Sequence, residues 1–179
     1  MNSRISFLFA SAFLTSLILL YSCGMDPQPT QSTGNISMMD DSLLNYNKAV
    51  VKTEDQEIED LIHRYGWKMG KSATGLRYMI YKPGSGERAV KGKKAMIRYE
   101  VRLINGNLCY SSSEKDMKEF IIGQGAVEVG IEEGILLMRV GDRAKFIVPS
   151  HLGFGLLGDQ DKIPPKSTLI YDIELIKLN

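Results

Sequence analysis

The chain has 179 residues, 44% hydrophobic and 24% charged, which is enough for one compact domain with an attached segment but too few for two ordinary enzyme domains. Its 22 basic and 21 acidic side chains give a formal charge of +1, whereas nucleic-acid binding normally comes with a clear basic excess. Two cysteines and two histidines exclude a disulfide scaffold and a zinc site built from those residues.

The chain begins with a segment typical of an export signal. Residues 5–20 carry no charge and are rich in Phe, Leu and Ile, but a membrane-spanning helix needs roughly 20 apolar residues. The sequence Leu20-Tyr21-Ser22-Cys23 then resembles a bacterial lipobox. This resemblance implies that a signal peptide, residues 1–22, is cleaved and that lipid attached to Cys23 anchors the protein to a membrane. A plain secretory signal, or a membrane anchor with an incidental cysteine, is the alternative.

Two further segments are expected before the main domain. Residues 23–52 are predicted to be a flexible tether, because prolines and polar residues leave little apolar periodicity. Residues 53–74 are predicted to be a helical lead-in, with a helix over about 54–66. A capping-box pattern begins that helix, and apolar residues recur in it at helical spacing. These features are Thr53 and Gln56 for the cap, and Ile58, Leu61, Ile62 and Tyr65 for the apolar face.

Residues 75–179 are predicted to form a β-rich domain of the α+β class. Apolar residues alternate with others in several runs, which is a strand pattern, and Asn105-Gly106 marks a tight turn. A single apolar stripe, Ile131, Ile135 and Met138, indicates one short helix. We therefore expect an antiparallel sheet with one short helix across its inner face. The strand runs are residues 76–81, 95–103, 120–122, 144–148 and 169–175.

Several motifs of this domain occur in an order that is similar to one known family. They are Val127 to Gly134, Met138 to Lys145, Phe146 to Ser150, Gly153-Phe154-Gly155, Ile163-Pro164-Pro165 and Leu169 to Leu175. Together they resemble the FKBP-type peptidyl-prolyl cis-trans isomerases. The region upstream resembles the lead-in of lipoprotein members, including those linked to gliding motility. The resemblance implies a twisted antiparallel sheet wrapped on one short helix, preceded by a separate N-terminal helix.

The resemblance also implies a pocket that needs no nucleophile, metal or cofactor. Rotation about a peptide bond costs about 18–20 kcal/mol because resonance gives the C–N bond double-bond character. An apolar pocket that strips water from an X-Pro amide disfavours this charge-separated form and favours the twisted bond. The residues that the resemblance places at this pocket are Tyr99, Cys109, Tyr110, Val127, Glu128, Ile131, Phe154, Ile163 and Tyr171.

Some of these positions depart from the family's pattern. Cys109-Tyr110 stands where the family has Phe-Asp, so that an apolar wall and a carboxylate are missing. Glu128 replaces an isoleucine whose backbone N–H receives a substrate carbonyl, and Ile131 replaces the tryptophan that forms the pocket floor in the best-known members. Lys118 or Glu119 replaces another aromatic residue.

These observations favour a membrane-tethered prolyl isomerase that acts on proline-containing polypeptides, namely exported proteins as they fold. The alternatives are a catalytically weak binding module in an envelope or motility assembly and a purely structural lipoprotein. Gly24 lacks the aspartate that signals retention, which predicts an outer membrane of the bacterial cell envelope, facing the periplasm. No cofactor, metal or nucleic acid is expected.

Overall fold

The computed structural model describes residues 33–113 and 115–179, with backbone only for residues 33–41. The predicted signal peptide, Cys23 and the first part of the tether lie outside the described residues. Within the described part, no helix has both the length and the apolar character needed to cross a membrane. The chain divides into two units, Met1–Leu43 and Leu44–Asn179, and all contacts below lie within the second unit.

Helix α2 (Thr33–Tyr65) is much longer than predicted. It includes residues 33–52, where we expected a flexible tether, so that this part of the prediction is wrong. The reason is local: no proline or glycine occurs between Asn35 and Tyr65, so nothing interrupts a helix once it has formed. The end of the helix is as predicted, because Gly66 takes φ +63° and donates its N–H to the His63 carbonyl.

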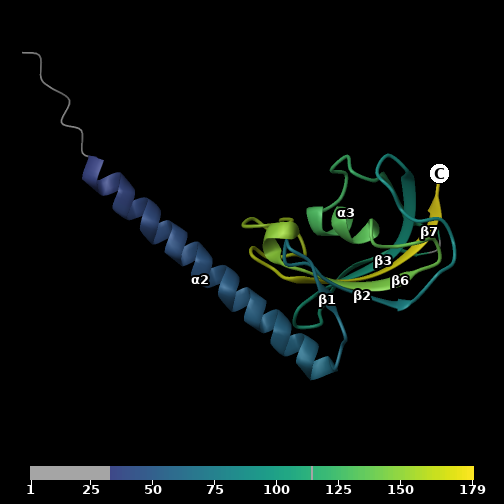
Figure 1. Ribbon diagram of the computed structural model, residues 1–179, viewed down its shortest axis with the longest axis horizontal. Coiled ribbons are helices and arrows are strands. Elements are labelled where there is room, and N and C mark those ends of the chain that lie inside the picture. Colours follow the sequence, from purple (N-terminus) through teal and green to yellow (C-terminus); the bar gives the residue numbers. More distant parts are fainter. Residues whose placement is uncertain (1–32, 114) are drawn as a thin grey trace, which may run out of the picture. The chain divides into compact units, whose positions relative to one another are not determined.

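Seven antiparallel strands form one sheet in the order β1-β2-β6-β7-β3-β4, with β5 also pairing with β3 (Figure 1). All five predicted strand runs are present, and β3 and β4 are joined by the predicted Asn105-Gly106 turn, in which Gly106 has φ +92°. The strands are β1 (Gly70–Lys71), β2 (Arg77–Lys82), β3 (Lys94–Leu103), β4 (Leu108–Ser111), β5 (Lys118–Ile121), β6 (Arg143–Val148) and β7 (Leu169–Leu178).

The short helix α3 (Val129–Ile135) lies against the concave face of the sheet, as predicted (Figure 1). Two glycines allow it to approach β6 closely. A Cβ atom at Gly134 would lie 2.8 Å from the Phe146 ring, and one at Gly130 would lie 2.6 Å from Val148. The main core therefore fills the space between α3 and the sheet, and a 3-10 helix, η2 (Ser150–Leu152), follows β6 at its edge.

The C-terminal half of α2 packs on the opposite face of the sheet. Ile58 and Leu61 form a second buried cluster with Ile147 of β6 and Ile170 of β7. Because successive strand residues point to opposite faces, Ile147 faces α2 while its neighbours on β6 face α3. The sequence left open whether this helix packs on the domain, and the structure shows that it does.

A buried arginine joins the same helix to the sheet. Arg77 of β2 is only 1% exposed, although the alternation places it on the polar side of the strand. Its guanidinium group forms ion pairs with Asp55 (2.5 Å) and Glu59 (2.7 Å) of α2. Two carboxylates thus compensate the burial of this charge, and α2 is what buries it.

Candidate functional site

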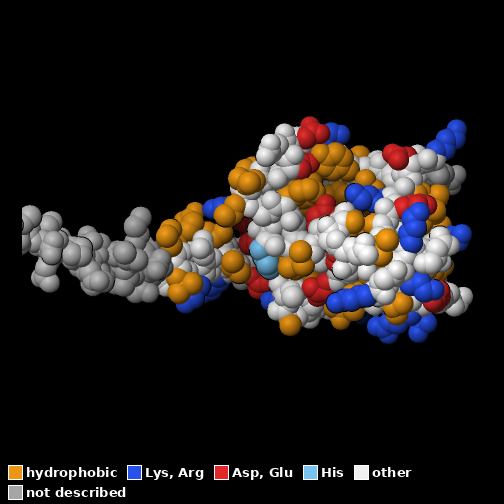
Figure 2. Space-filling model, turned by 90° about the horizontal axis from the view of Figure 1, so that it is seen from above, with side chains coloured by type: hydrophobic (Ala, Val, Ile, Leu, Met, Phe, Trp, Pro, Cys, Tyr) orange, Lys and Arg blue, Asp and Glu red, His pale blue; other side chains and the backbone are white. Residues whose placement is uncertain are grey.

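A cavity of about 250 Å³ opens between α3, strands β3, β4, β5 and β7, and the loop that follows η2. Seen from the α3 side, the surface of the molecule shows a hollow with hydrophobic side chains gathered around it (Figure 2). Most of the cavity wall is aromatic or aliphatic, and its charged residues are one lysine and two acids. The lining residues are Ile97, Tyr99, Val101, Tyr110, Lys118, Val127, Glu128, Ile131, Phe154, Asp159 and Tyr171.

Seven of the nine predicted pocket residues line this cavity, and Cys109 and Ile163 do not. Cys109 precedes Tyr110 on β4, and neighbouring strand residues point to opposite sides, so only Tyr110 reaches the cavity. The Cys109 side chain is buried beside the Lys162 carbonyl, and burial raises the pKa of its thiol. Ile163 is buried in the core, and its backbone pairs with Asp159. Both residues belong to the main hydrophobic core instead.

Tyr99 and Tyr171 line the cavity, and both of their hydroxyl groups are protonated and therefore uncharged. Burial raises the pKa of Tyr171 far above its usual value, and the charge of Glu128 and a hydrogen bond to it raise it further. Burial also raises the pKa of Tyr99, with added repulsion from Asp116 and Glu128. At neutral pH both hydroxyls therefore remain protonated. Tyr171 donates its proton to Glu128, and Tyr99 can donate a hydrogen bond to a ligand in the cavity.

The carboxylate of Asp159 lies beside Tyr110, the position at which this sequence lacks the family's carboxylate. The Tyr110 hydroxyl donates to Asp159, and it lies 3.3 Å from Asp161. The hydrogen bond to Asp159, followed by burial and the charge of Asp159, raises the pKa of Tyr110. Burial opposes ionisation of Asp159, but hydrogen bonds from Tyr110 and from the backbone N–H groups of Asp161 and Ile163 outweigh it and lower the pKa. Asp159 is therefore an ionised acceptor in the cavity wall.

Four lining residues were not among the predicted ones. Ile97 and Val101 lie two positions either side of Tyr99 on β3, so the alternation already placed them on the same face. Lys118 was identified only as a replacement for an aromatic residue. Asp159 lies in a loop, and no periodic pattern identifies a loop residue that folds back onto a strand.

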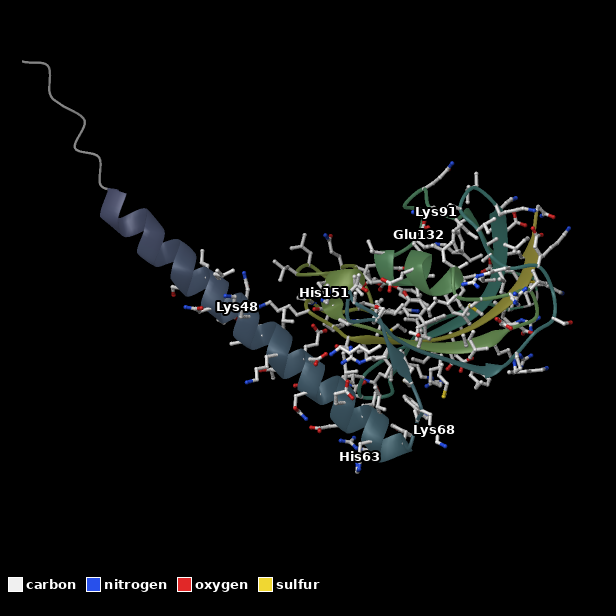
Figure 3. The ribbon with its side chains drawn as sticks, viewed as in Figure 1. Lys48, His63, Lys68, Lys91, Glu132 and His151 are labelled. Carbon is white, nitrogen blue, oxygen red and sulfur yellow. The ribbon has the colours of Figure 1, made fainter. Side chains whose placement is uncertain are left out.

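The chain's histidines belong to no common site. Figure 3 shows His63 near the end of α2 and His151 beside the domain's loops, well separated from each other. His151 hydrogen-bonds the Thr74 carbonyl at 3.0 Å, and both histidines are exposed. In residues 33–113 and 115–179, no three His, Cys, Asp or Glu side chains gather in a way that could hold a metal ion.

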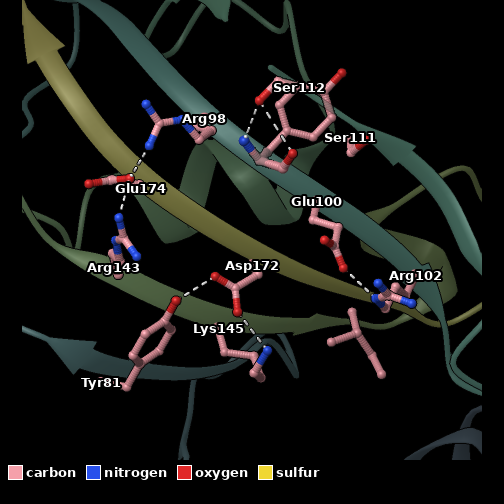
Figure 4. A pocket seen from close by; sticks show the side chains of 12 residues that line it. Tyr81, Arg98, Glu100, Arg102, Ser111, Ser112, Arg143, Lys145, Asp172 and Glu174 are labelled. Carbon is pink, nitrogen blue, oxygen red and sulfur yellow. Dashed lines mark hydrogen bonds and ion pairs between the residues drawn. The ribbon is translucent and has the colours of Figure 1, made fainter. Parts of the chain in front are cut away.

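A second hollow lies on the face of the sheet away from α3, and it differs in character (Figure 4). Its charged side chains pair with one another: Glu174 with Arg98 (2.8 Å) and Arg143 (3.0 Å), and Asp172 with Lys145 (2.8 Å). Such a surface satisfies its own charges, whereas the apolar cavity under α3 leaves hydrophobic surface available to a ligand. The cavity under α3 is therefore the candidate site.

Known proteins are similar to this chain over the domain that contains the cavity. Residues 85–176 match the sequence model of the family described as FKBP-type peptidyl-prolyl cis-trans isomerase. A probable FKBP-type peptidyl-prolyl cis-trans isomerase FkpA from Neisseria meningitidis serogroup B is 33% identical over 134 residues, which cover 74% of this chain and 49% of that protein. The chain thus spans about half the length of this relative.

Two further proteins match over nearly their whole length. An FK506-binding protein, also from Neisseria meningitidis serogroup B, is 38% identical over 105 residues, which cover 58% of this chain and 96% of that protein. The crystal structure of AtFKBP13 superposes with a TM-score of 0.60 at 32% identity, covering 63% of this chain and 99% of that one. The predicted fold is confirmed, with a twisted antiparallel sheet on one short helix.

Proposed function

Because this chain belongs to the family of FKBP-type peptidyl-prolyl cis-trans isomerases, we propose that its cavity binds a proline-containing segment of a polypeptide and catalyses rotation about the bond before the proline. The observation that carries this proposal is the cavity itself. It is lined by aromatic and aliphatic side chains at the motif positions, on the face of the sheet that α3 covers.

The cavity can lower the rotation barrier by desolvation and shape. Ile131, Val127 and Phe154 offer apolar surface to the proline ring, and water is excluded from the amide next to it. The charge-separated resonance form that keeps the amide planar is then less favourable, while the twisted bond loses little. Because this effect is greater for the transition state than for either planar isomer, it accelerates both directions of the reaction.

Polar groups around the cavity can orient the substrate's carbonyls. The neutral hydroxyl of Tyr99 is a donor within the cavity, whereas Tyr171 donates its single proton to Glu128. Glu128 lines the cavity too, and among the described residues no acceptor contacts its backbone N–H. These donors can hold the carbonyls on either side of the proline while the bond between them turns.

The Tyr110–Asp159 pair supports catalysis over the alternative of a binding module with weak activity. That alternative rested on Cys109-Tyr110, Glu128 and Ile131, and the first of these removes a carboxylate from the pocket. Asp159 reaches the Tyr110 hydroxyl from a different loop, so the cavity wall contains an ionised carboxylate despite the substitution. The carboxylate of Glu128 remains the feature that favours weaker binding of apolar substrates.

An isomerase assay on the purified protein tests the proposal. Rotation should be measured with a proline tetrapeptide and during refolding of a protein limited by proline isomerisation. Phe154→Ala removes a ring from the cavity and should lower kcat/KM roughly 10-fold or more, the effect of about 1.4 kcal/mol. Tyr81→Phe in the second hollow is the control and should leave the rate unchanged. Wild-type rates equal to the uncatalysed rate would exclude catalysis.

We also propose that the protein acts on exported proteins while anchored to a bacterial outer membrane by lipid on Cys23. The uncharged segment 5–20 and the lipobox-like sequence before Cys23 support this proposal. In cells given a radioactive fatty acid, the wild-type chain should be labelled and should sediment with membranes. Cys23→Ser should lose both properties and Cys109→Ser should keep them. Equal labelling of the two variants would refute lipid attachment at Cys23.

A further inference from the structure

One residue of α2 contacts both ends of the loop that completes the cavity. Residues 150–168 leave β6, contribute Phe154 and Asp159 to the cavity wall and then enter β7. The Glu54 carboxylate accepts hydrogen bonds from the Ser150 N–H (2.6 Å) and hydroxyl (3.0 Å) and from the Thr168 hydroxyl (2.6 Å). Three donors from the two ends of one loop thus converge on a single carboxylate.

We propose that Glu54 is a positioning residue of the isomerase site, which holds residues 150–168 so that Phe154 and Asp159 face the cavity. This inference rests on the proposed isomerase function of that cavity. It makes α2 a part of the active unit, although none of its residues lines the cavity.

Hydrogen bonds inside the loop connect Glu54 to the cavity wall. The Gly155 N–H donates to the Ser150 carbonyl at 2.8 Å, and the Lys166 N–H donates to the Gly155 carbonyl at 2.9 Å. Gly155 directly follows Phe154, so both ends of the loop are tied to the backbone beside the pocket ring. A shift at either end therefore moves Phe154, and a displacement of 1 Å in a catalytic site can lower the rate about 100-fold.

Charge makes Glu54 the strongest link between α2 and this loop. Hydrogen bonds to a carboxylate are about twice as strong as neutral ones. Among the described side chains, the other hydrogen bond between α2 and this loop joins the exposed Tyr46 and Lys166, whose hydroxyl and ammonium groups are 3.3 Å apart. Exposed contacts of this kind contribute little.

The docking of α2 on the sheet does not depend on Glu54. Ile58 and Leu61 are buried against the sheet, and Asp55 pairs with Arg77. A Glu54 variant should therefore keep its helix in place and lose only its hold on the loop. This separation allows a positioning role to be distinguished from a general loss of stability.

The test compares four variants of the whole protein. Glu54→Ala should lower kcat/KM for a proline peptide between about 10- and 100-fold, mainly through kcat, and Glu54→Gln, which keeps one carbonyl acceptor, should recover part of the loss. Glu57→Ala is the matched control, because this exposed residue on the same helix has no partner among the described residues. Ile58→Ala destabilises the fold without touching the loop. All four should be assayed well below their melting temperatures.

Amide NMR provides a readout that does not depend on activity. Glu54→Ala should shift the amide signals of Phe154 and Asp159, and Glu57→Ala should not. The positioning role is overturned if Glu54→Ala keeps the wild-type kcat/KM, or if Ile58→Ala lowers it equally. A wild-type protein without isomerase activity would refute the proposed function instead, so the two failures are distinguishable.

Discussion

The docking of α2 on the sheet predicts a large loss of stability from one substitution, Ile58→Ala. The Ile58 side chain is fully buried between Leu61, Ile147 and Ile170. In the variant, Leu61 and the ion pairs of Arg77 still hold α2 on the sheet, but the space that the Ile58 side chain filled against β6 and β7 is left partly empty. The substitution therefore tests whether α2 belongs to the folded domain.

The expected magnitude follows from the volume removed. Ile→Ala deletes three carbon groups, worth about 0.8 kcal/mol each in transfer free energy, or about 2.4 kcal/mol in total. A residual cavity adds to this, and measured core truncations of this kind cost about 2–5 kcal/mol. Because the cluster has only four buried members, α2 can shift to fill part of the space. We expect a loss of about 2–3 kcal/mol.

Urea unfolding followed by circular dichroism measures this loss. With a slope of about 1–3 kcal/mol per molar urea, the midpoint should fall by on the order of 1 M while the slope stays unchanged. Val51→Ala is the control on the same helix, because Val51 is 50% exposed and its truncation should cost less than about 0.5 kcal/mol. If Ile58→Ala costs no more than Val51→Ala, then α2 does not pack on the sheet in solution.

Three further predictions concern ionisation. Tyr110→Phe removes a hydrogen bond that lowers the pKa of Asp159, so that this pKa should rise in an NMR titration. Glu128→Gln removes a charge that helps to raise the pKa of Tyr99, and this pKa should fall in an ultraviolet titration. Hydrogen bonds from its basic partners lower the pKa of Asp55, so its contribution to stability is present above about pH 4 and lost as pH falls below that value. Asp55→Asn should therefore reduce the difference in unfolding free energy between pH 5 and pH 3.

Each of these three predictions would be contradicted by one specific result. An unchanged Asp159 pKa in Tyr110→Phe would mean that the two side chains do not meet in solution. A Tyr99 titration that is insensitive to Glu128 would mean that this carboxylate does not lie near the cavity tyrosines. A wild-type pH dependence retained in Asp55→Asn would assign the acid sensitivity to other carboxylates. Glu57→Gln, at an exposed position of α2, is the control for the last measurement.

The sequence alone predicted those parts of the structure that depend on local patterns. Ala95, Ile97 and Tyr99 alternate along β3, and a period of two assigns them to one face whatever lies opposite. Asn105-Gly106 favours a tight turn because Gly106 adopts a positive φ without strain. The pocket residues came instead from the family resemblance, and seven of those nine positions line the cavity: three on strands, three on α3 and its approach, and Phe154 in the loop after η2.

The tertiary structure decided the features that depend on distant segments meeting. Arg77 reads as a surface residue until α2 covers it, and Asp159 supplies a carboxylate only because its loop folds back onto Tyr110. Glu54 receives its three donors from residues about a hundred positions further along the chain. Hydrophobic periodicity and secondary-structure propensity depend on a few neighbouring residues. Ion pairs and loop contacts depend on which distant residues the fold brings together in space. Length, charge and motifs thus identified the kind of protein, and packing determined which side chains complete its site.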